Sequence, residues 1–401
     1  MRCLSSLLVA VAVLAVVSPV VWAADEDPVK TVEAALRGVR LGKPLQAEPL
    51  ILIPLIAEAE PKPLAIVADL KSKNVRFTEP EWPRRRFNVK VENGEKTPLL
   101  LLGGNFLVGG KLDRLLTRDL LVPAGKGVEI ETIPAEYSRD PKAEEKPFRV
   151  GVKFGGSTSP MYLRERARFD PSARLVPTFV SHFAEFRDEG DKRNSLAAID
   201  SSQALATYCV VCQGKTRGFT ELEGGRVVGF ISAVRGRLYV FELFGTNDLL
   251  SDYFLSVLKA HSFNAAAIEL KAKKLKIPLP GGDDPKATMA AVVKQAEQLL
   301  AELQEKPRAK ADDLPRGVSG ASVLIKAKNS QGAALVHDGR LVHAVIFPDN
   351  PFERALYSRP IDVPAEASSD ETSFGGMSRR EGRGTLSEAE KRLLERMRSR
   401  R

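Results

Sequence analysis

Three pairs of apolar segments, each joined by a two-residue turn that contains glycine, constrain the fold of this chain more than any other feature. The turns are Asn93-Gly94, Arg235-Gly236 and Asp338-Gly339. Asn-Gly and Asp-Gly tolerate the positive φ angles of tight hairpin turns, whereas Arg-Gly is a weaker pair with strong flanking strands. The sequence therefore predicts an α+β fold of antiparallel, hairpin-rich sheets packed with a few helices.

The predicted hairpins join 87–91 to 99–102, 227–234 to 238–244, and 333–337 to 341–347. In the middle hairpin, a regular two-residue turn would place Phe230 opposite Phe241 and Ala233 opposite Leu238. Both faces of this hairpin are mostly apolar, so we expect it inside the fold and not at a solvated edge.

Two helices carry clear sequence signals. Residues 248–260 form one apolar stripe at helical spacing. In 283–306, Asp284 is a suitable N-cap and Pro285 stands at the first helical position, where its missing N–H costs nothing. We expect this second helix to pack on its own domain and not to dimerise. Shorter helices are expected at 32–37 and 64–70, and a buried strand interrupted by proline within 48–60.

The N-terminus has the pattern of an export signal. Arg2 precedes an apolar run over 4–17, and Val21-Trp22-Ala23 ends in small residues suited to signal peptidase. We expect a signal peptide over 1–23, cleaved after Ala23 or Ala24, and a secreted or periplasmic location. The alternative is an uncleaved anchor, since residues 4–24 are just long enough for a membrane span, which needs ~20 residues. No later segment reaches that length, so no transmembrane segment is expected after cleavage.

The rest of the chain is expected to form an α+β region over 24–360, either as one body or as halves at about 46–165 and 175–360. A disordered basic tail over 361–401 is expected to follow, because that stretch has few apolar residues. The formal net charge is +9. An exported protein rarely meets a genome, so we expect no nucleic acid partner. An anionic envelope component is the partner that would suit the tail.

Cys209 and Cys212 would be the only cysteines left after export, which favours a disulfide between them. A strand over 206–212, indicated by its Thr, Tyr and Val content, would hold their Cα atoms ~10 Å apart, beyond the reach of a disulfide. Buried free thiols and a redox pair are the alternatives. A zinc site would need a second pair of ligands, which the sequence does not offer.

The four histidines form no pattern typical of a metal site. His337 and His343 are expected on opposite faces of the last hairpin, so they cannot share a metal. His261 is expected near a helix C-terminus, where it would complement the helix dipole. His182 has no partner nearby in the sequence. We expect no metal site and no cofactor.

A second group of candidate residues follows two glycine pairs, Gly103-Gly104 and Gly109-Gly110. Paired glycines indicate a close approach of the backbone or a bulge. The candidates are Lys111, Asp113, Arg114, Glu136 and Arg139. If they converge on one pocket, they would bind an anionic ligand. For Asp113 and Arg114 themselves, a structural ion pair is favoured over a role in ligand binding.

These stretches resemble a bacterial family, the ARG and rhodanese-phosphatase-superfamily-associated protein domain. The similar blocks are 75–139, 229–267 and 332–347, and the first contains Asn93, Gly109-Gly110-Lys111 and Arg114. Leu112 stands where the family usually has glutamine. Residues 134–139 replace a Cys-x-Glu-x-x-Arg-Trp segment and keep only its Glu136 and Arg139. The family's biochemical function is unestablished, so the resemblance implies no particular reaction.

The sequence does not assemble an acid–base, nucleophile or metal constellation. The leading hypothesis is therefore an exported, envelope-associated binding or scaffold protein of unknown ligand. The alternative is an exported hydrolase that acts on a nucleotide or ADP-ribose-like anion through the five candidate residues. A redox role for Cys209 and Cys212 is the third hypothesis, and whether the protein is an enzyme is left open.

Overall fold

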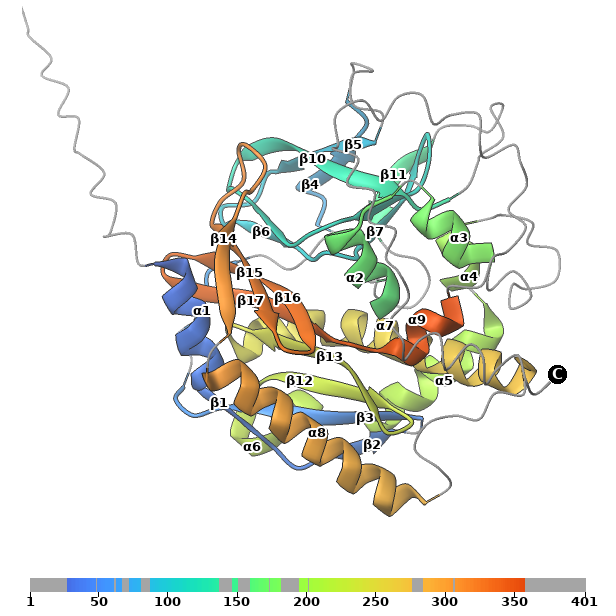
Figure 1. The fold of residues 1–401 in the computed structure, drawn as a ribbon. Coiled ribbons are helices and arrows are strands. Elements are labelled where there is room, and N and C mark those ends of the chain that lie inside the picture. Colours follow the sequence, from blue (N-terminus) through green and yellow to red (C-terminus); the bar gives the residue numbers. More distant parts are fainter. Residues whose placement is uncertain are drawn as a thin grey trace, which may run out of the picture.

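A computed structural model gives the fold of the chain (Figure 1). It describes residues 27–47, 49–60, 63–66, 72–80, 87–136, 146–150, 159–172, 174–181, 195–200, 202–275, 284–305 and 307–357. The predicted signal peptide, the predicted tail, Arg139 and His182 lie outside these residues. Within the described residues, no helix is both long and apolar enough to cross a membrane.

A nine-stranded antiparallel sheet, here called the large sheet, forms the centre of the molecule. Its strands run in the order β1-β3-β12-β13-β17-β16-β15-β14, and β2 also pairs with β3. Their bounds are β1 Val39–Leu41, β2 Leu45–Ala47, β3 Leu50–Ala57, β12 Val227–Val234, β13 Arg237–Phe244, β14 Arg308–Asp312, β15 Ala321–Ala327, β16 Ser330–His337 and β17 Arg340–Pro348.

Both faces of the large sheet are buried, as the alternation along β3 shows. Leu50, Leu52 and Ile56 belong to the core on one face. Ile51 and Ile53 belong to the core on the other face. The first core includes α5 (Gln203–Lys215) and α7 (Asn247–Leu275), and the second includes α1 (Pro28–Arg37) and α8 (Pro285–Glu305). The sheet therefore lies between helices on both sides, as in Figure 1.

A second body of strands stands above the large sheet in Figure 1. It contains a six-stranded sheet in the order β11-β7-β8-β10-β5-β4 and the pair β6-β9. The bounds are β4 Val75–Thr78, β5 Asn88–Asn93, β6 Leu99–Leu101, β7 Phe106–Gly110, β8 Arg114–Leu116, β9 Leu120–Val122, β10 Lys126–Pro134 and β11 Lys146–Val150.

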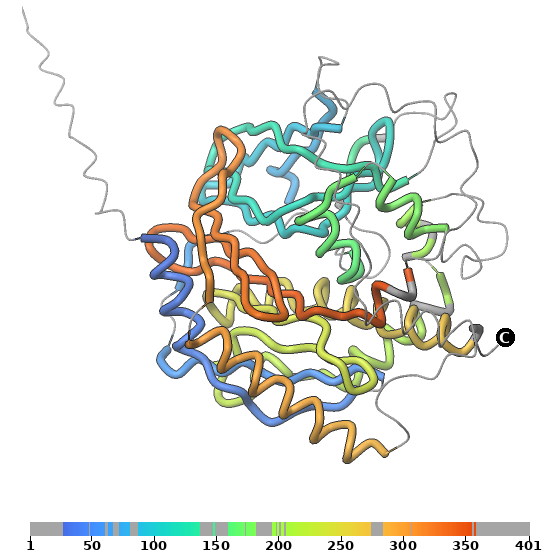
Figure 2. The backbone as a smooth tube through the Cα atoms, in the orientation of Figure 1, coloured from blue at the N-terminus to red at the C-terminus, as the bar shows by residue number. Residues whose placement is uncertain are grey.

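The path of the chain ties the two bodies together. The chain leaves the large sheet after β3, forms the second body, and returns to the large sheet at β12 (Figure 2). Strand β3 pairs with β12 over seven positions, so a strand from the first half of the sequence lies inside the sheet of the second half. The helices that follow the second body are α2 Met161–Phe169, α3 Leu175–Ser181 and α4 Leu196–Asp200.

The middle predicted hairpin is confirmed as β12 and β13. Arg235 and Gly236 form its turn with φ angles of 48° and 78°. Ala233 lies opposite Leu238 as predicted, but Phe230 lies opposite Glu242 and not opposite Phe241. The reason is a register shift between Ser232 and Ala233, which moves every pair beyond it by one residue. The hairpin is buried between β3 and β17, as its apolar faces indicated.

The last predicted hairpin is also confirmed, but the first is wrong. Strands β16 and β17 meet at Asp338-Gly339, with φ angles of 49° and 65°. Strand β5 pairs with β4 and β10, whereas β6 pairs with β9. The Asn93 side chain explains the difference, because it donates to the carbonyls of Thr97 and Val122, each at 3.0 Å. The Asn93 side chain therefore holds a connection longer than a two-residue turn, and this connection leads to β6, which pairs with β9 and not with β5.

The helix predictions are confirmed in part. Helix α8 begins after Asp284, whose carboxylate accepts from the amides of Lys286 and Ala287. Helix α7 continues well beyond the predicted residues, because Phe263 and the alanines after it are also buried. The buried strand predicted within 48–60 is confirmed as β3, but Pro54 does not interrupt it.

Residues 63–66 lie outside any helix, and the remainder of the helix predicted at 64–70 is not described. The remaining short elements are η2 Phe219–Glu221, α6 Leu222–Gly225 and α9 Pro351–Tyr357.

Candidate functional site

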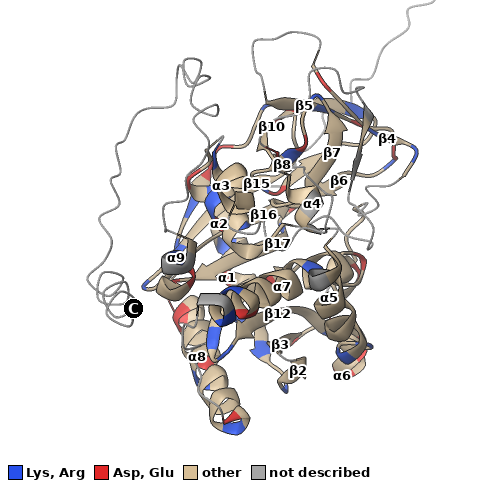
Figure 3. Cartoon of the chain, turned by 90° about the vertical axis from the view of Figure 1, so that its right-hand side faces the viewer, with Lys and Arg blue, Asp and Glu red and all other residues tan. Residues whose placement is uncertain are grey.

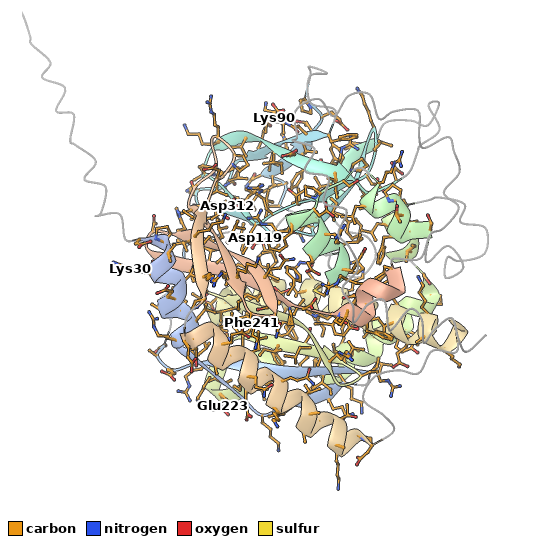
Figure 4. The ribbon with its side chains drawn as sticks, in the orientation of Figure 1. Lys30, Lys90, Asp119, Glu223, Phe241 and Asp312 are labelled. Carbon is orange, nitrogen blue, oxygen red and sulfur yellow. The ribbon has the colours of Figure 1, made fainter. Side chains whose placement is uncertain are left out.

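A groove with a volume of about 860 Å³ opens at one end of the large sheet, beside α1. One wall is the face of α1 that carries Lys30, Thr31, Ala34 and Ala35. The other walls are the end of β3, the end of β13 and the turn between β16 and β17. Figure 4 labels Lys30 on this helix. The volume lies in the range of small-molecule sites, about 300–1,000 Å³.

The floor of the groove is apolar and its rim carries charges of both signs. Val228, Leu243 and Phe244 form the floor. Lys30, Glu58 and Arg340 stand among the lining residues. Nη1 of Arg340 donates to the carbonyl of Pro63 at 2.8 Å, which holds that guanidinium at the rim. The groove can therefore take an apolar body and orient a polar end.

A buried ion network lies behind Phe244 and links the large sheet to the second body. Its members are Asp119, Arg164, Glu242 and His343. The centroids of the Phe244 and His343 rings are 4.4 Å apart. His343 Nδ1 lies 2.7 Å from Asp119 Oδ2, and Nε2 lies 2.8 Å from Glu242 Oε2. Arg164 completes the network by donating to both oxygens of Glu242.

The network is electrically balanced because two cations face two carboxylates. Burial alone lowers the pKa of His343, but the charge and hydrogen bond of Asp119, together with Glu242, raise that pKa to about 9. Burial raises the pKa of Glu242, but the charge of Arg164 and the two histidines hold it well below its ordinary value. Both nitrogens of His343 thus donate to carboxylates, and the ring has no nitrogen left to accept a proton from a ligand.

Backbone contacts at Gly103 anchor the network in the second body. Asp119 Oδ1 accepts from the Gly103 amide at 2.7 Å. Arg164 Nε donates to the Gly103 carbonyl at 3.0 Å. The same glycine therefore fixes an anion and a cation of the network. The geometry of the ion network fits a structural link between the two bodies. In such a link every buried charge must be paired, because an unpaired buried charge is strongly destabilising.

The predicted residues Lys111, Asp113, Arg114 and Glu136 do lie near one another, in the second body. Asp113 Oδ1 accepts from the Gly109 amide at 2.9 Å, and the Asp113 amide donates to Glu136 Oε1 at 2.9 Å. Arg114 pairs with Glu79 at 3.1 Å. These contacts hold the loop and the strand ends around them, as in a structural cluster.

Glu79 is the residue of this cluster that sequence reasoning missed. Its Oε1 accepts from the Lys111 amide and from Arg114 Nη2, both at 3.1 Å. Arg114 Nη1 also donates to the backbone carbonyl of Asp113, at 3.4 Å. No local pattern around Glu79 signals this role, because the partners are separated by more than thirty residues.

Cys209 and Cys212 lie on helix α5, so the predicted strand is wrong. Both thiols are free and buried. Cys209 Sγ lies 3.9 Å from the Lys259 carbonyl, and Cys212 Sγ lies 3.5 Å from the Ala47 carbonyl. Burial raises the pKa of Cys212. The structure thus has the buried free thiols and not the disulfide, and a raised pKa disfavours a reactive thiolate.

His261 also differs from expectation. His261 lies in the middle of α7, not near its C-terminus, because the helix continues to Leu275. Its Nε2 is 3.5 Å from Glu242 Oε1, at the outer limit of a hydrogen bond. Burial lowers the pKa of His261, and Glu242 offsets this only in part. Within the described part of the chain, no group of three or more His, Cys, Asp or Glu residues is placed to hold a metal ion.

The ion network could not be found from the sequence. Asp119, Arg164, Glu242 and His343 come from four separate segments, and only Glu242 and His343 belong to strands predicted from the sequence. Glu242 gave the one usable signal, since it is the only charge within the apolar run 238–244. A carboxylate in a strand buried on both faces needs a partner.

Comparisons with known proteins place the chain in a family but near no characterised protein. No curated protein matches it. No solved structure matches it either. The family model of the ARG and Rhodanese-Phosphatase-superfamily-associated Protein domain matches residues 38–347, and the chain belongs to this family.

Proposed function

We propose that this protein is an exported binding protein that takes a ligand with an apolar body in the groove beside α1. The observation that carries the proposal is the groove itself, with its volume of about 860 Å³ and its apolar floor. Burial of apolar ligand surface contributes about 25 cal/mol per Å². Val228, Leu243 and Phe244 are at most 3% exposed, so the more open lining residues Ala34, Ala35 and Leu64 would supply most of the apolar contact, while the charged rim orients the ligand.

The wall formed by α1 keeps the groove open. Ala34 and Ala35 face it with single methyl groups, and Ala34 is exposed. A larger side chain at either position would project into the space that a ligand needs. Because Ala34 lies on the exposed side of a short amphipathic helix, its replacement leaves Val32 and Leu36 buried in the core.

Export and a partner for the basic tail complete the proposal. The signal pattern over 1–23 supports export, and Asp27, the N-cap of α1, follows the expected cleavage site by only a few residues. Cleavage would thus leave the described fold intact. The tail over 361–401 would add attraction to an anionic envelope component. Elsewhere, Lys and Arg are interspersed with Asp and Glu in Figure 3, which does not favour a nucleic acid surface.

A hydrolase built on Lys111, Asp113, Arg114 and Glu136 has less support. General acid–base catalysis needs a group within hydrogen-bond reach of the substrate. The carboxylate of Asp113 instead binds the Gly109 amide, and that of Glu136 binds the Asp113 amide. Arg114 is only 1% exposed. These contacts favour a binding protein over an enzyme that uses this cluster.

The test uses N-phenyl-1-naphthylamine, a neutral apolar dye, and the mature chain with residues 24–401. We expect saturable fluorescence enhancement from one site in the unaltered protein. Ala34→Trp should reduce the dye affinity about tenfold or more by filling the groove. Arg37→Trp is the matched control, because Arg37 is on the same helix but does not line the groove, and it should bind normally.

The outcome that would overturn the proposal is equal binding by the two variants, or no saturable binding by any of the three proteins. Circular dichroism and thermal unfolding of each protein verify that the variants are folded. A solvent extract of the purified protein, analysed by mass spectrometry, would then identify the class of any co-purified ligand.

A further inference from the structure

A second, much smaller cavity lies between the large sheet and the second body. Its polar lining includes Thr117, Arg118, Asp119, Arg164, Arg168 and Ser322. Its apolar lining comes from Ala333, Ala334, Val345 and Phe347. The open space is only about 20 Å³, which is enough for about one water molecule. We call it the arginine pocket.

The Asp312 carboxylate is not part of this lining but pairs with two of the arginines that are, Arg118 and Arg168. Its Oδ2 lies 2.5 Å from Arg168 Nη2 and 3.6 Å from Arg118 Nη1. The hydroxyl of Ser322 is 3.4 Å from the same oxygen. Two guanidinium groups and a hydroxyl thus converge on one carboxylate oxygen, in the arrangement that proteins use to bind an oxyanion.

The two arginines are held in place independently of Asp312. Arg168 lies over the Phe169 ring at 5.7 Å. Arg118 Nη1 donates to the Asp313 carbonyl at 2.8 Å. Burial lowers the pKa of Arg118, and the charge of Arg168 lowers it further. Two like charges in a partly buried place favour an anion between them. The charges of Glu131 and Asp313, which are exposed, also raise the pKa of Arg118.

The position of Asp312 allows its carboxylate to be replaced. Asp312 is the last residue of β14, the edge strand of the large sheet, and between it and β15 the chain forms only a turn and a single bridge from Ser319 to Leu121. Figure 4 labels Asp312 and Asp119 at the boundary between the two bodies. Asp119 is held by His343 and by the Gly103 amide and is 8% exposed, whereas the Asp312 side chain is 21% exposed and can be reached from solvent.

We propose that the arginine pocket binds a phosphate-sized oxyanion between Arg118 and Arg168, with the carboxylate of Asp312 as the internal anion that it displaces. The open space is too small for phosphate while Asp312 is in place, so the two anions compete. Binding would release the end of β14 from α2. This site is separate from the groove beside α1, and neither proposal depends on the other.

The test is calorimetric titration of the mature chain with inorganic phosphate, at constant ionic strength set with chloride. We expect weak binding by the unaltered protein. Asp312→Asn should bind about tenfold more tightly, because the internal competitor loses its charge. The double variant Asp312→Asn with Arg168→Gln should lose this gain. Asp312→Asn with Arg308→Gln is the matched control, since Arg308 is exposed on the same strand and should not matter.

A structural role alone gives a different pattern. If Asp312 only fastens β14 to α2, Asp312→Asn lowers the unfolding temperature and binds phosphate no more tightly than the unaltered protein, and the proposal fails. Ser322→Ala keeps both ion pairs and covers the case in which Asp312→Asn does not fold. It should raise the dissociation constant for phosphate several-fold, and an unchanged constant would overturn the proposal.

Discussion

His343 and Asp119 come from different bodies of the fold, yet Nδ1 of His343 and Oδ2 of Asp119 are 2.7 Å apart. The histidine belongs to β17 in the large sheet, and the aspartate follows β8 in the second body. With Glu242 on the other ring nitrogen at 2.8 Å, His343 is paired on both sides. The large sheet and the second body are thus joined by a fully paired buried charge.

Removing one member of this network should destabilise the protein strongly. Asp119→Asn leaves His343 without its main counter-charge, and breaking a buried ion pair costs about 3–5 kcal/mol. We expect a loss of about 3 kcal/mol in the free energy of unfolding, measured by urea denaturation. Glu223→Gln is the control, because the pair of Glu223 with Arg40 is 42% and 47% exposed, and such pairs contribute about 0–1 kcal/mol. Equal stability of the two variants would contradict the prediction.

The same histidine should make stability depend on pH. The pKa of His343 is raised from 6.5 to about 9, so between these values the folded state holds a proton that the unfolded state lacks. This contribution is complete below pH 6.5 and is lost as the pH rises to 9. The expected slope is about −1.4 kcal/mol per pH unit. Urea denaturation at a series of pH values measures it, and His343→Gln should show a flatter dependence over this range.

Glu353 should produce a second pH dependence, at lower pH. Burial, together with the charge of Glu165 on α2, raises the pKa of Glu353 to about 8, which Asn264 and Arg354 oppose. Between pH 4.5 and 8 the folded state alone holds this proton, so stability falls as the pH rises. Glu353→Gln should remove that slope and be more stable than the unaltered protein at pH 8. If the stability of Glu353→Gln still falls with pH between 4.5 and 6.5 as steeply as that of the unaltered protein, this assignment is wrong.

The two cysteines should behave as protected thiols. Cys209 is 4% exposed and Cys212 is 1% exposed. We expect no alkylation by iodoacetamide in the native mature chain, and two adducts after denaturation without a reductant, as counted by mass spectrometry. If denatured protein is alkylated only after reduction, the thiols are bridged and the expectation is wrong.

The mature chain should begin at Ala24 or Asp25. Expression in a bacterial host, followed by fractionation and N-terminal sequencing, tests this. We expect the processed form in the periplasm or medium. Full-length protein retained in the membrane fraction would support the uncleaved anchor instead.

Local sequence signals predicted those parts of the fold that local contacts determine. The turns at Arg235-Gly236 and Asp338-Gly339 form hairpins because their φ angles and their flanking strands agree. The helix after Asp284 forms because its cap and its apolar stripe agree. Asn93 failed as a turn residue because its amide binds carbonyls of another strand, which no local pattern indicates.

The site residues were harder to predict, since they depend on distant partners. The valines between Cys209 and Cys212 indicated a strand, but they are exposed on a helix whose cysteines pack inward. This is a case of tertiary packing overriding local propensity. His261 and Glu242 meet only because β13 pairs with β12 and α7 crosses behind them. Neither relationship is encoded in spacing along the chain.

The order β3-β12-β13-β17 has a consequence for synthesis. Strand β3 leaves the ribosome early, but its neighbour β12 is made about 170 residues later and β17 about 100 residues after that. Such distant pairings delay folding, because loop closure must precede the contacts that reward it. The large sheet therefore cannot be completed until almost the whole chain has been translated. This delay would suit the proposed export, because it would keep the chain unfolded for passage through a membrane.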